Sequence, residues 1–235
     1  MLLVAVDGVV AGGAVTAWWD TSLMDMARAS WRNTTHDWAG GVDLDHLEGI
    51  RRDPVAFAPG GARHLVLEVL AYAADEAECT GGSRCVVTLH PDGSVSVADD
   101  GRGTDTRLDD HGRPVKKPVM ASKDLRFFDF PEAQRLPDGH PRRGMSVVAA
   151  LGEWLVHTNR RENGAWTQRY AHGIPVSGLE PVPGNGATGT VVHFRPNEHV
   201  REVSALSAAE LGRMVTAWPG LAVEVDDRRD LVKPE

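Results

Sequence analysis

A strand-like stretch ends in residues that could bind a small molecule. Residues 94–98 alternate valine with small or polar residues, a pattern typical of a half-buried strand, and Asp99 follows directly. The Asp99 carboxylate can accept hydrogen bonds from an amino group, and Gly101 and Gly103 let the backbone approach a bound molecule closely. Because Asp and Gly are also ordinary turn residues, the same stretch is equally consistent with a hairpin that ends in a loop.

A second stretch combines glycine, arginine and the start of a helix. Residues 139–144 read Gly-His-Pro-Arg-Arg-Gly and precede an apolar run, residues 145–151, that is predicted to be helical. Free N–H groups and the dipole at such a helix start attract anions. Residues 104–138 have no sustained periodicity and contain four prolines, which predicts a long loop of the kind that commonly forms a lid.

Periodicity identifies the elements that must position these residues. The strongest signal is a helix over residues 62–78, in which apolar residues recur at i, i+3, i+4 and i+7 while Glu68 and Tyr72 lie on a more polar flank. The other expected elements are a short helix at 47–52, hairpins at 84–99 and 153–170, strands at 174–181, 189–194 and 221–225, and a helix from Ser207 to about Trp218 that begins with a capping box.

Composition limits the class of protein. A chain of 235 residues with 42% hydrophobic and 25% charged residues is expected to form one globular domain, and a net charge of −8 argues against direct nucleic-acid binding. Two cysteines, Cys79 and Cys85, fit neither a disulfide framework nor a zinc motif, so a cytoplasmic location is expected. The apolar residues 1–17 are too short to span a bilayer comfortably, and no membrane association is expected.

The order of these features resembles the ATP-binding domain of the gyrase, chaperone, histidine-kinase and MutL superfamily, the Bergerat (GHKL) fold. Within it the sequence is most similar to the ATPase subdomain of the gyrase B protein and of the E protein of topoisomerase IV. The matching stretches are residues 47–54, 64–69, 75–77, 92–103, 146–151, 170–175 and 188–196. The resemblance implies an α+β fold, a two-layer α/β sandwich with a mixed, mostly antiparallel sheet and helices on one face. It covers residues 45–228, leaving residues 1–44 as a Trp-rich arm or leader and residues 229–235 as a charged tail.

The resemblance also implies roles for individual residues. Asp99 matches the residue that binds the adenine amino group, with Thr190 nearby, and Glu68 occupies the position of the general base. The implied nucleotide-binding residues are Asp99, Gly101, Arg102, Gly103, Gly139, Arg142, Arg143, Gly144, Arg161, Gly189 and Thr190. The implied ligand is ATP or ADP.

Two departures from the family pattern argue against efficient hydrolysis. Tyr72 stands where the family has the asparagine that holds Mg²⁺, and a neutral phenol is a poor ligand for that ion, so no metal site is expected. In the glycine-rich lid motif, Pro141 removes an N–H donor and Arg142 replaces a glycine. One hypothesis is that Arg142 and Arg143 neutralise phosphates in place of the metal; the alternative is that both are solvated lid arginines.

These observations favour a gyrase-B-type adenine-nucleotide-binding protein, a pseudo-ATPase with weak or absent Mg²⁺-dependent hydrolysis. The chain stops where the first subdomain stops, so topoisomerase activity is not expected of it alone. The alternative is a nucleotide-free scaffold that pairs with a second copy or with a gyrase subunit. A stand-alone kinase like the anti-sigma kinases is a weaker third, because that group too needs the missing asparagine.

Overall fold

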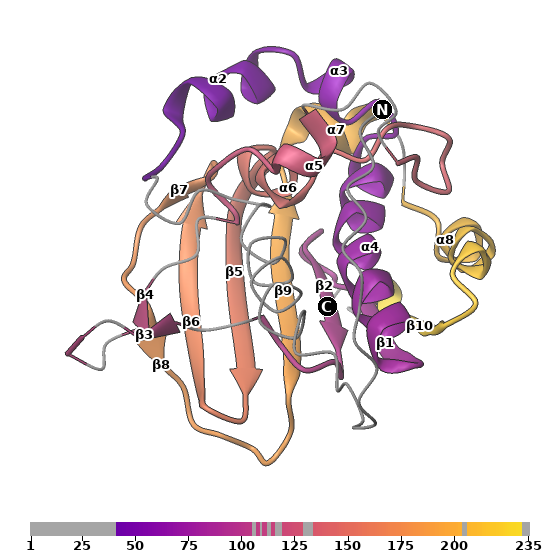
Figure 1. Cartoon of the computed structure of the whole chain (residues 1–235). Helices are drawn as coiled ribbons and strands as arrows, with labels where there is room; N and C mark the ends of the chain where they lie inside the picture. Colours follow the sequence, from indigo (N-terminus) through magenta and orange to yellow (C-terminus); the bar gives the residue numbers. More distant parts are fainter. Residues whose placement is uncertain are drawn as a thin grey trace, which may run out of the picture. The chain divides into compact units, whose positions relative to one another are not determined.

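The computed structural model describes residues 41–104, 107–108, 110–111, 114–115, 119–128, 134–203 and 206–231, all within one compact unit. The helices, labelled as in Figure 1, are α2 (Leu44–Arg52), α3 (Pro54–Phe57), α4 (Ala62–Thr80), α5 (Leu125–Phe128), α6 (Met145–Ala150), α7 (Glu198–Val203) and α8 (Ala208–Met214), with 3-10 turns at Val215–Ala217 and Arg229–Leu231. The strands are β1 (Ser83–Leu89), β2 (Val95–Asp99), β3 (Arg107–Leu108), β4 (Pro114–Val115), β5 (Gly152–Arg161), β6 (Gly164–Ala171), β7 (Ile174–Pro175), β8 (Glu180–Pro181), β9 (Gly189–Pro196) and β10 (Leu221–Asp227).

One mixed sheet organises the described part of the chain. Its eight strands run in the order β10-β1-β2-β9-β5-β6-β7, with β8 also paired to β6, and β3 and β4 form a separate pair. Only the β1–β10 pair of this sheet is parallel; its other pairs are antiparallel. Helices α4 and α6 lie against one face (Figure 1). The predicted α+β sandwich with a mostly antiparallel sheet is therefore confirmed.

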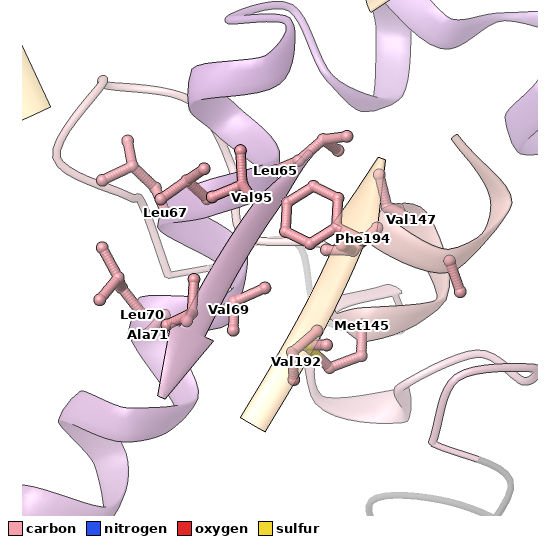
Figure 2. Packing of buried hydrophobic residues seen from close by; sticks show 14 of the residues in the cluster. Leu65, Leu67, Val69, Leu70, Ala71, Val95, Met145, Val147, Val192 and Phe194 are labelled. Carbon is pink, nitrogen blue, oxygen red and sulfur yellow. The ribbon is translucent and has the colours of Figure 1, made fainter. Parts of the chain in front are cut away.

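The hydrophobic core fills the space between α4, α6 and the central strands. Leu65 and Val69 of α4 and Val147 of α6 point toward Val192 and Phe194 of β9 (Figure 2). Phe194 is fully buried at the middle of this contact. Burying such large apolar side chains is the main stabilising contribution to a layered fold, so α4 is held firmly against the sheet.

Helix α4 confirms the strongest sequence prediction. It runs for 19 residues and ends at Gly81, whose φ of 83° is the left-handed conformation that favours glycine at a helix end. The predicted apolar stripe is buried, but so is Glu68 of the supposed polar flank, which is 0% exposed. The polar flank therefore faces other parts of the chain, and a buried carboxylate requires partners there.

The predicted hairpins, the helix at residues 145–151 and the strands at 189–194 and 221–225 are all present, with ends shifted by no more than two residues. The capping box at Ser207 is present in part: its hydroxyl accepts a hydrogen bond from the backbone N–H of Glu210 at 3.3 Å, whereas the Glu210 carboxylate binds Arg63. Helix α7 was not predicted. It begins at an Asn197 cap, where the side chain accepts a hydrogen bond from the N–H of Val200.

The prediction of one strand over residues 174–181 was wrong. Only its two ends pair with β6, as β7 and β8. Between them the hydroxyl of Ser177 accepts a hydrogen bond from the N–H of Arg169, and its carbonyl accepts one from the side chain of Gln168. Side-chain bonds thus replace the regular ladder and interrupt the strand.

The long loop predicted at residues 104–138 contains short elements where it is described: β3, β4 and α5. The proposed arm at residues 1–44 lies outside the described residues up to residue 40, and so do residues 232–235 of the proposed tail. Across the described ranges, no helix combines the length and apolar character needed to cross a bilayer.

Candidate functional site

Asp99 lies at the end of β2, beside the start of β9. One carboxylate oxygen accepts a hydrogen bond from the N–H of Gly101 at 3.0 Å, and the N–H of Thr190 also faces the carboxylate. Burial raises the pKa of Asp99 to about 6; these two N–H groups oppose the shift, and the nearby Glu76 and Asp100 carboxylates add to it. At pH 7 the group is therefore mostly ionised and can accept a hydrogen bond from an amino group.

Glycine is required around Asp99 by close contacts within the protein. A Cβ at Gly189 would lie 2.0 Å from the Asp99 carbonyl oxygen, and one at Gly103 would lie 2.3 Å from the carbonyl oxygen of Arg160. A Cβ at Gly101 would lie 2.7 Å from Cγ of Glu76 and 2.9 Å from the Asp99 carboxylate. These glycines therefore fix how closely the β2 loop approaches α4, β5 and β9.

We expect Gly101→Ala to destabilise the protein by about 1–2 kcal/mol, because the new methyl must displace both Glu76 and Asp99. Gly184→Ala is the matched control, since a Cβ there has no atom within 4 Å and its φ is not in the left-handed region. Urea denaturation measures the free energy of unfolding of both variants. That of Gly184→Ala should stay within about 0.5 kcal/mol of wild type. Equal effects of the two substitutions would contradict this packing argument.

Arg102 and Arg161 both make contacts at this end of the sheet. The Arg102 guanidinium makes two hydrogen bonds with Glu76 of α4, at 2.6 and 3.0 Å. Arg161 donates a hydrogen bond to the carbonyl of Gly103 at 2.8 Å. The structure thus brings together Asp99, Gly101, Arg102, Gly103, Arg161, Gly189 and Thr190.

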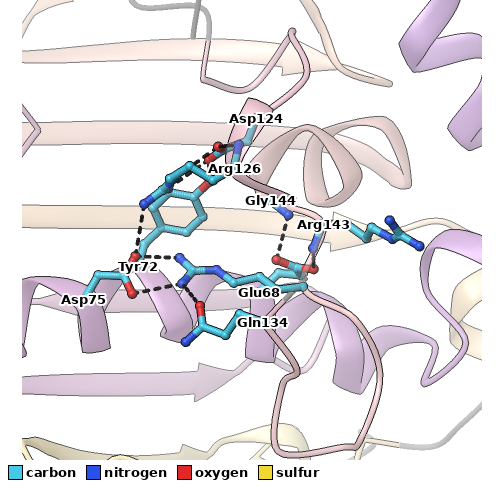
Figure 3. Close-up of polar contacts among 9 residues, drawn as sticks. Glu68, Tyr72, Asp75, Asp124, Arg126, Gln134, Arg143 and Gly144 are labelled. Atoms are coloured by element: carbon cyan, nitrogen blue, oxygen red, sulfur yellow. Dashed lines mark hydrogen bonds and ion pairs between the residues drawn. The ribbon is translucent and has the colours of Figure 1, made fainter. Parts of the chain in front are cut away.

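Residues 134–144, which include the glycine-rich motif and which we call the lid segment, contact the polar flank of α4. The buried carboxylate of Glu68 accepts hydrogen bonds from the N–H groups of Arg143 and Gly144, the latter at 2.8 Å (Figure 3). His64, one turn earlier on α4, lies 3.4 Å from Glu68 through Nε2 and 2.7 Å from Asp138 through Nδ1. Burial alone would lower the pKa of His64, but the two carboxylates outweigh it and raise the pKa to about 9.

Arg142 belongs to a partly buried group of polar residues that we call the Arg142 cluster: Tyr72, Asp75, Asp124, Arg126, Gln134 and Arg142. The Arg142 guanidinium makes two hydrogen bonds with the Asp75 carboxylate, at 2.9 and 2.8 Å, and one with Gln134. It also lies over the ring of Tyr72 at 4.6 Å. Arg142 is 1% exposed, so in this structure it is an internal counter-ion.

The other half of the Arg142 cluster holds Tyr72. The phenol donates a hydrogen bond to Asp124 at 2.8 Å, and Arg126 binds the same carboxylate at 2.8 and 3.1 Å (Figure 3). Burial and the Asp124 carboxylate raise the pKa of Tyr72, so the hydroxyl stays protonated. Two arginines thus balance two aspartates within the cluster.

The remaining lid residues differ in their surroundings. The Arg143 guanidinium lies 5.5 Å from the ring of Phe128, outside the Arg142 cluster. Gly144 packs tightly, because a Cβ there would lie 3.2 Å from both the Tyr72 hydroxyl and Asp124, whereas Gly139 has open space around it. The lid segment therefore contacts α4 at the helical turns that carry Glu68 and Tyr72. The loop that follows Asp99 contacts α4 one turn later, at Glu76.

The residues around Tyr72 do not fit Mg²⁺, which requires several oxygen ligands in octahedral geometry. Glu68 is occupied by two N–H donors, Asp75 by Arg142, and Asp124 by Arg126 and Tyr72. The fixed positive charges of two arginines among these carboxylates oppose a divalent cation. In the described ranges, no group of three or more His, Cys, Asp or Glu side chains could hold a metal.

Sequence reasoning missed several residues of this site. Asn159 is buried on β5 and forms two hydrogen bonds with the backbone of Thr104, which fixes the loop after Gly103. His64 could have been found, since it lies one helical turn before Glu68. Asp124 and Asp138 lie in the aperiodic stretch before the lid motif and carry no comparable sequence signal.

Known sequences provide an independent comparison. The chain is 29% identical over 196 residues to the B subunit of DNA topoisomerase 4 of Bacillus subtilis, a match that covers 80% of this chain and 30% of that protein. It is 32% identical over 196 residues to the DNA gyrase B subunit of Thermotoga maritima, covering 77% of this chain and 30% of that protein. It is 31% identical over 199 residues to the DNA gyrase B subunit of Archaeoglobus fulgidus, covering 80% of this chain and 32% of that protein. No family model matches the chain.

The mixed, mostly antiparallel sheet with α4 and α6 on one face defines a Bergerat-fold domain. Within that class, the chain is a relative of the ATP-binding subdomain in the B subunits of DNA gyrase and topoisomerase IV. It spans between 30% and 32% of the length of the three relatives named above.

Proposed function

We propose that the protein binds an adenine nucleotide, ATP or ADP, and hydrolyses it weakly or not at all. The observation that carries this proposal is the Asp99 carboxylate at the β2–β9 end of the sheet, held in place by a glycine-containing loop that packs closely on α4, β5 and β9. An ionised carboxylate fixed by two backbone N–H groups can select a ligand by its amino group. The order of the site stretches, which resembles that of the ATP-binding family, supports adenine as the base that carries this amino group.

The surroundings of Glu68 support weak hydrolysis. A general base must lie within hydrogen-bond reach of the water that it activates. Here both oxygens of Glu68 accept hydrogen bonds from lid N–H groups, and the side chain is fully buried. Phosphoryl transfer also depends on charge neutralisation by a metal, and the residues around Tyr72 do not fit one. Glu68 therefore serves the attachment of the lid in this state.

A second candidate function is favoured by the Arg142 cluster. If the lid never leaves α4, the protein is a nucleotide-free scaffold in the cytoplasm. Its partner would then be a second copy of the chain or a gyrase-type subunit, with no direct contact to nucleic acid. The internally paired arginines of the Arg142 cluster are what supports this candidate.

The two candidates differ in the effect of ligand on the melting temperature. A ligand that binds only the folded state must raise that temperature, so we expect ADP at high concentration to produce an upward shift in the wild type. Asp99→Asn should abolish most of the shift, because its one acceptor oxygen is needed by the N–H of Gly101, which leaves the amide NH₂ toward the ligand's amino group. Binding should also weaken as the pH falls through about 6, where Asp99 becomes protonated.

Asp92→Asn is the matched control, because Asp92 lies before β2 at the opposite end of the strand, is exposed and keeps an acceptor oxygen for Ser94. This variant should retain the full ligand-induced shift. If ATP and ADP do not shift the melting temperature of the wild type, nucleotide binding is excluded and the scaffold function is the candidate that remains. A full shift in Asp99→Asn would exclude the proposed role of Asp99.

A further inference from the structure

We propose that the Arg142 cluster sets the ligand specificity of the site, so that it prefers an adenine nucleoside to a metal-bound polyphosphate nucleotide. This inference rests on the proposed function, because it presumes that adenine binds at Asp99. The inference goes beyond the proposed function, because it predicts that the site binds a nucleoside more tightly than ATP. Arg142 and Tyr72 are its specificity-determining residues.

The first step concerns Arg142 itself. A guanidinium can neutralise a phosphate only if the phosphate reaches its N–H groups. In Arg142 these groups already form two hydrogen bonds with Asp75 and one with Gln134, and the planar group lies within 4.6 Å of the Tyr72 and Phe127 ring centres. Phosphate binding would have to break the contacts of this buried guanidinium, so the hypothesis that Arg142 replaces the metal is disfavoured.

The second step concerns the surface of α4. Glu68, Tyr72 and Asp75 occupy positions i, i+4 and i+7, so they lie on successive turns of one helix face. Each is contacted by the lid segment or by Asp124. Glu76, which binds Arg102 beside Asp99, follows on the same helix. A phosphate chain that extends from adenine at Asp99 toward Glu68 would therefore meet a covered face of α4.

The third step concerns charge. A polyphosphate placed along this face would approach the carboxylates of Glu68, Asp75 and Asp124. Arg126 and Arg142 already bind the two aspartates, so these guanidinium groups are not available to neutralise a phosphate. A nucleoside carries no such charge, and its amino group can still reach Asp99. Discrimination then comes from the cost of placing a charged phosphate chain against a face whose arginines are already paired with aspartates.

The inference can be tested by calorimetric titration of the full chain with adenosine, ADP and ATP, the nucleotides with and without Mg²⁺. We expect wild type to bind adenosine at least about tenfold more tightly than Mg-ATP, with Mg²⁺ having no effect on ATP affinity. Tyr72→Asn combined with Arg142→Gly should remove the internal cation and restore an amide oxygen, so its preference for adenosine should fall by about tenfold.

Arg135→Gly is the matched control, because Arg135 lies in the same segment but is exposed, and its guanidinium donates a hydrogen bond to the Gly139 carbonyl. Its ligand preference should equal that of wild type. Tight, Mg²⁺-dependent ATP binding by wild type would overturn this inference and leave the proposed function standing. Absence of binding by every adenine compound would overturn both, and the wild-type titrations decide this even if the double variant does not fold.

Discussion

Replacing Glu68 by alanine is expected to lower the free energy of unfolding by about 4 kcal/mol, because it removes the partner of several buried groups at once. The N–H groups of Arg143 and Gly144 lose their acceptor, and the protonated His64 loses one of its two carboxylates. Unsatisfied buried donors each carry a desolvation cost. Urea denaturation followed by circular dichroism measures the change.

Two further variants separate this effect from general damage to α4. Glu68→Gln keeps an acceptor oxygen for one of the two lid N–H groups but turns its NH₂ toward the other and loses the negative charge beside His64, so about half of the destabilisation should remain. Glu78→Ala lies on the same helix at an exposed position and should change stability by less than about 0.5 kcal/mol. If Glu68→Ala and Glu78→Ala changed the free energy of unfolding by the same amount, the attachment of the lid segment would not depend on Glu68.

The same contacts give stability a defined pH dependence. The pKa of His64 rises from an ordinary value of 6.5 to about 9 on folding, so the folded state binds this proton more tightly. The resulting stabilisation is fully present below pH 6.5 and is lost as the pH rises through about 9. The facing groups are Asp138, Glu68 and the ring of His140 at 6.0 Å. Removing the Glu68 charge should reduce the rise in the pKa of His64, so this stabilisation should be lost at a lower pH than in the wild type.

Sequence reasoning worked where short-range patterns decide the structure. The periodicity of residues 62–78 fixes the buried face of α4, and the turns at Pro91-Asp92-Gly93 and Asn163-Gly164 fix two hairpins. Asp99 could be placed at the end of a strand for the same reason. The sheet order could be expected only through the family resemblance, because strand pairing such as β2 with β9 joins segments far apart in the chain.

The state of the lid could not be predicted from such patterns. Arg142 pairs with Asp75 across a sequence separation of 67 residues, and His64 pairs with Asp138 across 74. The sequence showed that Tyr72 replaces a metal-binding asparagine, but it did not show that a guanidinium lies over the phenol ring. Whether a charged side chain is solvated or internally paired depends on tertiary contacts, and this distinction separates the two interpretations of Arg142.

Arg142→Ala is expected to lower the free energy of unfolding by about 3 kcal/mol, because it removes a buried guanidinium that pairs with Asp75 and packs against the rings of Tyr72 and Phe127. The loss stays below that expected for Glu68→Ala, since Asp75 is 37% exposed and its unpaired charge can be partly hydrated. Equilibrium urea denaturation at pH 7 and at two salt concentrations measures the effect.

Arg142→Met and Arg142→Lys divide the contribution of Arg142 into packing and charge. Methionine fills most of the space between Tyr72 and Phe127 without a charge, whereas lysine keeps the charge but cannot form the planar, two-bond contact with Asp75. If packing dominates, Arg142→Met should recover more than half of the stability lost in Arg142→Ala. If the ion pair dominates, Arg142→Lys should recover more. Wild-type stability in Arg142→Ala would mean that the guanidinium is solvated and free to meet a phosphate, which would remove the physical basis for a ligand preference set by the Arg142 cluster.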